Sequence, residues 1–96
     1  MEARHAQVFA ALRRAALDGP GELPPEVRRA VAAGESPEPL AGYLDKVRRH
    51  AYKVVDRDVE ALREAGWSED ALFEVTIAAA VGEGLRRLDV GLEALR

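Results

Sequence analysis

The chain has 96 residues, of which 48% are hydrophobic and 32% are charged, and its net charge is −3. This composition is typical of a folded globular protein, and the length suits one hydrophobic core, so we expect a single helical domain over residues 1–96. The negative charge gives the chain as a whole no long-range attraction for nucleic acid or for an anionic membrane. Neither is an expected partner.

The sequence contains no cysteine. This excludes disulfide bonds, thiolate metal sites and every catalytic mechanism that needs a protein thiol. Charged residues interrupt the apolar stretch of the first 17 residues, unlike the core of a secretory signal, and no run of 18 apolar residues occurs. We therefore expect a cytoplasmic protein.

Two helices are predicted in the first third of the chain. The first covers residues 2–17, because apolar residues recur there at helical spacing and a Gly-Pro pair follows. The second is a short helix within the segment LPPEVRRAVAAG, because Pro24 and Pro25 suit its first turn and Gly34 suits a left-handed cap at its end. The apolar residues that the two spacings align are Val8, Phe9, Leu12, Ala16, Val27 and Val31.

A third helix is predicted after Ser36, whose hydroxyl can cap the first amides. Its apolar seam consists of Leu40, Leu44, Val47, Ala51 and Val54. Asp56 can cap a fourth helix that ends at Gly66, and the boundary at 55–56 is either a break or a kink.

The last predicted helix covers residues 69–95. Its start is the best-marked boundary, because Ser68 offers a capping oxygen and the two acids after it favour the positive end of the helix. Its first half is apolar nearly all round and should be buried, whereas one apolar stripe remains after Gly84. We expect this stripe to meet a partner helix; its residues are Val81, Leu85, Leu88, Leu92 and Leu95.

These patterns predict an all-α fold, a compact domain of about five helices that ends in a long helix. Gly82 and Gly84 lie inside that long helix, where glycine is unfavourable, so we expect them to permit a close approach of another backbone.

Few residues are suited to catalysis or to metal binding. The two histidines do not form a paired metal-binding motif, and no phosphate-binding glycine loop follows a strand. Both serines are expected to cap helices rather than to act as nucleophiles. We expect no metal and no cofactor.

One cluster of polar residues could carry acid–base chemistry. Its members are Tyr43, His50, Tyr52, Asp58 and Glu74. Glu74 continues the apolar seam of the last helix backward, so partial burial would raise its pKa and let it exchange a proton. Packing and capping roles for these groups are the favoured interpretation.

Four Arg-Arg pairs occur, at 13–14, 28–29, 48–49 and 86–87. Their intervals are irregular and acids lie between them, so we expect solvated helix faces and ion pairs between helices rather than an anion site.

The segments LPPEVRRAV, AYKVVDRDVEALREAGWSEDALFE and TIAAAVGEGLRRLD resemble the alkylhydroperoxidase-like, carboxymuconolactone-decarboxylase-like superfamily. Peroxidases of this superfamily carry Cys-x-x-Cys-x-x-x-His about eight residues before a glycine. Counting back from Gly66, these positions hold Ala51, Val54 and Asp58, so the resemblance excludes thiol peroxidase activity. It implies small helical subunits that assemble as trimers or hexamers.

Three functions follow as hypotheses. The leading one is a redox-inactive member of the superfamily that acts as an oligomeric structural protein or binds a small molecule. The second is a decarboxylase-like enzyme, in which Arg49 or Arg57 would hold a carboxylated substrate. Its proton-transfer groups would be His50, Tyr52, Asp58 or Glu74. The third is a helical adaptor that uses the apolar stripe of the last helix to bind another protein.

Overall fold

The structure, a computed structural model, describes residues 3–95 and contains helices but no strand over that range. The all-α fold with five helices and a long last helix is confirmed. The helices are α1 (Ala3–Arg13), α2 (Pro25–Ala32), α3 (Ala41–Arg49), α4 (Asp56–Glu64) and α5 (Glu69–Ala94). A π-helical turn follows α1 at Arg14–Asp18, and a short 3-10 turn lies between α3 and α4 at Ala51–Lys53.

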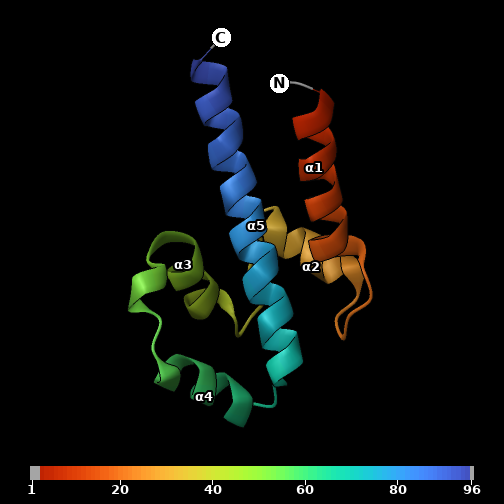
Figure 1. Cartoon of the computed structure of the whole chain (residues 1–96). Helices are drawn as coiled ribbons and strands as arrows, with labels where there is room; N and C mark the ends of the chain where they lie inside the picture. Colours follow the sequence, from red (N-terminus) through yellow and green to blue (C-terminus); the bar gives the residue numbers. More distant parts are fainter. Residues whose placement is uncertain (1–2, 96) are drawn as a thin grey trace.

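The long helix α5 is the axis around which the other helices are arranged (Figure 1). Helices α2 and α3 pack on its middle, and α4 crosses below its beginning. Helix α1 runs antiparallel beside the C-terminal half of α5, and both ends of the chain lie at that end of the molecule (Figure 1). The fold therefore has a packed body and two helical segments that extend from it.

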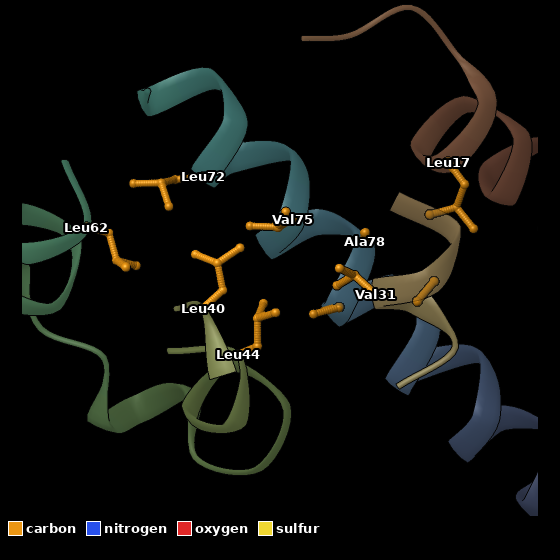
Figure 2. Packing of buried hydrophobic residues seen from close by; sticks show 10 residues of the cluster. Leu17, Val31, Leu40, Leu44, Leu62, Leu72, Val75 and Ala78 are labelled. Atoms are coloured by element: carbon orange, nitrogen blue, oxygen red, sulfur yellow. The ribbon is translucent and has the colours of Figure 1, made fainter. Parts of the chain in front are cut away.

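The buried apolar residues form one cluster, to which α2, α3, α4 and α5 all contribute. Leu40 and Leu44 are completely buried, and Figure 2 shows them facing Leu72 and Val75 of α5. Leu62 closes the cluster from α4 on the other side. Burial of these side chains is the main source of stability in the fold.

The first half of α5 lies in this core, as predicted. The residues that it buries are Ala71, Leu72, Val75, Ala78, Ala79 and Gly82. Phe73 departs from the expected all-round burial, since its side chain is largely exposed on the face that no other helix covers.

The two glycines of α5 differ. A Cβ atom on Gly82 would overlap the backbone of Ala32, so the predicted close approach is confirmed there and joins α2 to α5. A Cβ atom on Gly84 would meet no other atom within 4 Å, so the same prediction is wrong for Gly84.

Helix boundaries agree with the sequence where a local signal sets them. The Ser68 hydroxyl accepts a hydrogen bond from the Ala71 N–H at 3.1 Å, as a capping oxygen should. Gly34 and Gly66 both adopt φ +106°, and each follows the helix that it was predicted to end.

Two predicted caps are wrong. Ser36 does not cap α3, which begins at Ala41; its hydroxyl instead accepts a hydrogen bond from Arg48 at 2.6 Å. Asp56 does not cap α4 either: it is the first residue of the helix, Val55 is at the N-cap position, and Asp58 accepts the Val55 N–H at 2.9 Å. In both places the hydrogen bond that forms joins residues other than those that the prediction paired.

The seam predicted for the third helix is also too long. Helix α3 ends at Arg49, and His50 has a non-helical backbone (φ −143°, ψ 54°). Ala51 is exposed and Val54 is half-buried, so neither lies on a helical seam. The chain has to reverse here, since a straight continuation of α3 would carry Leu62 away from the core.

Candidate functional site

The four candidates for proton transfer have three separate sets of partners. His50 and Tyr52 contact each other edge to face, with 5.9 Å between ring centroids, in the exposed connection from α3 to α4. The Lys53 ammonium lies 5.9 Å from the centre of the Tyr52 ring. These groups form a local surface cluster beside Ala51, which is also exposed.

Asp58 fixes the start of α4. Its carboxylate accepts the Val55 N–H and forms an ion pair with Lys46 at 2.9 Å. The backbone hydrogen bond from Val55, followed by the bond from Lys46, holds the pKa of Asp58 below its ordinary value. A carboxylate held in its charged form suits capping better than proton abstraction.

Glu74, on the first half of α5, binds the loop that precedes α2. Its carboxylate accepts the N–H of Glu22 at 2.7 Å and that of Leu23 at 2.9 Å. Only 15% of its side chain is exposed, and Arg28 lies 3.9 Å away. Glu74 therefore anchors the loop that leads into α2, and the predicted partial burial is observed.

Arg28 is a buried charge on α2, with 2% of the residue exposed. Its guanidinium donates to the Gly19 carbonyl at 2.5 Å and lies 3.4 Å from the carbonyl of Ala16. A buried charge is stable only when paired and hydrogen-bonded, and Glu74 supplies the opposite charge.

Two further arginines bind the C-terminal carbonyls of α2. Arg48 donates to Val31 at 2.9 Å, and Arg86 donates to Ala32 at 2.6 Å. Cations at this end of a helix are favoured by its dipole and satisfy carbonyls that lack a helical partner. The sequence interpretation of these arginine pairs as solvated faces missed this role, because the bonds join residues far apart in the chain.

The second arginine of each of these three pairs forms an ion pair at the surface, as expected. Arg29 pairs with Asp18 at 2.8 Å, Arg49 with Asp45 at 3.3 Å and Arg87 with Glu83 at 3.4 Å. Arg49 is thus exposed and engaged with its own helix.

A shallow hollow of about 360 Å³ lies between α3 and α4. Its lining includes Tyr43, Lys46, Arg57 and Asp58. The Tyr43 hydroxyl forms a hydrogen bond with the Thr76 hydroxyl, 2.7 Å away. Arg57, one of the two predicted carboxylate binders, lines this hollow, whereas Arg49 forms its ion pair with Asp45.

The apolar stripe of the long helix lies where α5 leaves the body. Val81, Leu85, Leu88 and Leu92 are half-buried, whereas Leu95 is 83% exposed. Between this stripe and α1 is a groove of about 230 Å³, and its apolar lining comes from Phe9, Ala10, Leu85 and Leu88. Arg13 and Asp89 stand at its edge. We call this surface, the stripe together with the groove, the α1–α5 face.

Within residues 3–95, no group of three or more acidic or histidine side chains is placed to hold a metal ion. Over the same part of the chain, no helix is long and apolar enough to cross a membrane.

Comparisons with family models, with curated proteins and with solved structures each give no match to this chain. The superfamily resemblance therefore stays a prediction.

Proposed function

We propose that the protein is a non-enzymatic structural protein that works as a closed homo-oligomer, with the α1–α5 face buried between subunits. The observation that carries the proposal is the amount of exposed surface. The chain exposes 6447 Å², whereas a folded monomer of 10.4 kDa typically exposes about 5,400 Å². The excess of roughly 1,000 Å² is similar to what one subunit buries in a standard protein interface, about 800 Å².

The shape supports the same conclusion. The radius of gyration is 14.4 Å, compared with about 12.5 Å for a compact domain of this length. The molecule measures 46 × 28 × 19 Å, and the long dimension reflects α1 and the C-terminal half of α5 extending from the body (Figure 1). Assembly would cover the surface that this extension leaves in solvent.

The proposal includes the alkylhydroperoxidase-like scaffold, with Ala51, Val54 and Asp58 in place of the redox residues and a trimer or hexamer as the assembly. A long helix with a small-residue run, packed through Gly82 against α2, is compatible with it. A small-ligand-binding variant of the proposal would use the hollow beside Tyr43, whose cation Arg57 suits a carboxylate.

The proposal is tested by sedimentation velocity and native mass spectrometry of the full chain over a wide range of concentration. We expect one closed species above the monomer mass, and a monomer at every concentration would contradict the proposal. Leu88→Glu places a charge in the α1–α5 face and should dissociate the species. The matched control is Val90→Glu, on the same helix beside Glu83, Arg86 and Arg87, which should leave the mass unchanged.

The helical adaptor is the alternative that uses the same stripe of α5. A stable monomer that binds a different protein through Leu85 and Leu88 would favour the adaptor. A homo-oligomer that buries these residues would leave the adaptor no surface on that stripe.

A further inference from the structure

Helix α1 has almost no packing within its own chain. From residue 4 to residue 13 no side chain is buried, and Phe9 is the single half-buried one. Val8 is 59% exposed and Leu12 is 47% exposed, although both belong to the apolar side of this helix. Its contacts are mainly with the π-helical turn that follows it.

A helix of this length needs a packing partner. Helix α1 has 11 residues, and isolated helices shorter than about 12–15 residues are marginal in water, because most helical stability in proteins comes from burial of an apolar face. The groove toward Leu85 and Leu88 shows that α5 of the same chain covers α1 only in part. Val8 and Leu12 remain available to another surface.

We propose that α1 of one copy packs against the C-terminal half of α5 of a second copy. This inference rests on the proposed function and adds a subunit contact that the stripe of α5 alone does not define. Val8 and Leu12 would then lie in an apolar layer with Leu92 and Leu95 of the second copy.

Two observations identify the occupant as a second copy. The first is area, since the excess surface of one chain matches the share of one subunit in a standard interface. The second is charge: residues 3–17 contain three arginines and no acid, whereas the whole chain carries −3. A second copy, with its net charge of −3, therefore offers α1 the opposite charge overall.

The cysteine-free chain permits a direct test by disulfide cross-linking. Tagged Leu12→Cys and untagged Leu92→Cys copies are unfolded, mixed, refolded together and oxidised. We expect a cross-linked pair of mixed size, because the two positions would meet only between copies. Asp45→Cys, an exposed position on α3, replaces Leu92→Cys as the matched control and should give little mixed product.

Suppose that sedimentation shows an oligomer but the cross-link between positions 12 and 92 forms in no higher yield than the control cross-link between positions 12 and 45. That result would overturn this inference and leave the proposed function intact. A chain that is monomeric throughout would overturn both.

A second pair of variants measures the contribution of α1 to assembly. Leu12→Glu should raise the subunit dissociation constant by at least about tenfold, because assembly would lose a buried leucine and gain a buried carboxylate. Ala11→Glu introduces the same charge at an exposed position one residue away and should leave the subunit dissociation constant nearly unchanged. Circular dichroism of each variant monitors folding, and equal dissociation constants for the two variants would contradict the contact.

Discussion

The two halves of α5 belong to one continuous helix but lie in opposite environments. Up to Gly82 the helix packs against α2 and α3, with Leu62 of α4 closing the core, and this half holds all of the buried residues of α5. Beyond Gly82 it runs beside α1 and keeps a bond to α2 from Arg86 to Ala32, and its leucines are half-buried or exposed. A similar run of apolar residues is therefore core in one half and surface in the other, depending on which elements reach it.

The polar contacts show the same division. In the body, Arg28, Arg48 and Arg86 bind backbone carbonyls, and Glu74 binds backbone amides. These bonds fix the ends of short helices whose own residues cannot cap them. At the extended end, ion pairs such as that of Arg87 with Glu83 lie on the helix surface and contribute little to stability.

The largest expected difference between the two regions concerns leucines. Leu44→Ala should lower the free energy of unfolding by about 2–5 kcal/mol, because a fully buried side chain leaves a cavity. Leu95→Ala, at the exposed end of α5, should change it by less than about 0.5 kcal/mol in the monomer. Urea unfolding at low protein concentration measures both, and comparable losses would show that the division between core and extension is wrong.

The glycines of α5 sharpen the comparison at the boundary between its halves. Gly82→Ala should lower the free energy of unfolding by about 1–3 kcal/mol, since the added methyl forces α2 away from α5. Gly84→Ala has free space and should raise it by about 1 kcal/mol through helix propensity. Thermal and urea unfolding test the pair, and a shift of the same sign in both variants would contradict the contact with Ala32.

The smallest expected effect is a dependence on pH in the body. The pKa of Asp58 is lower in the folded chain than in the unfolded chain, so its contribution is present above the unfolded pKa and is lost as the pH falls through the folded pKa. Asp58→Asn should therefore lower the melting temperature at neutral pH and have little effect in strong acid. Asp45→Asn, on an exposed pair with Arg49, is the control, and identical pH profiles for the two variants would refute the assignment.

Much of the fold follows from local patterns in the sequence. The start of α5 can be predicted because the Ser68 oxygen accepts a hydrogen bond from an N–H only three residues later. Gly34 and Gly66 predict helix ends because a left-handed backbone conformation favours glycine. The core positions Val31 and Leu44 follow from helical spacing, since each lies on the apolar side of its helix, and Val75 follows from the all-round apolar half of α5.

The candidate site was less predictable, because its geometry depends on residues far apart in the chain. Spacing alone suggested that Asp58 and Glu74 could belong to one cluster with His50. In the fold, Glu74 instead binds the loop at residues 22–23, and Asp58 binds Lys46 and the start of its own helix. No periodic pattern encodes a bond across about 50 residues, and the bond from Arg86 to Ala32 is another example.

The sequence by itself determined the class of fold, the number of long helices and the absence of thiol chemistry, since these depend on periodicity, local caps and composition. The tertiary structure decided where α3 ends, which arginines are buried, and that the second half of α5 and nearly all of α1 stay uncovered. Those outcomes depend on which helices can reach one another once Gly82 has brought α2 against α5. The physical reason is that burial is a property of packed neighbours, whereas a sequence pattern specifies only the face that seeks them.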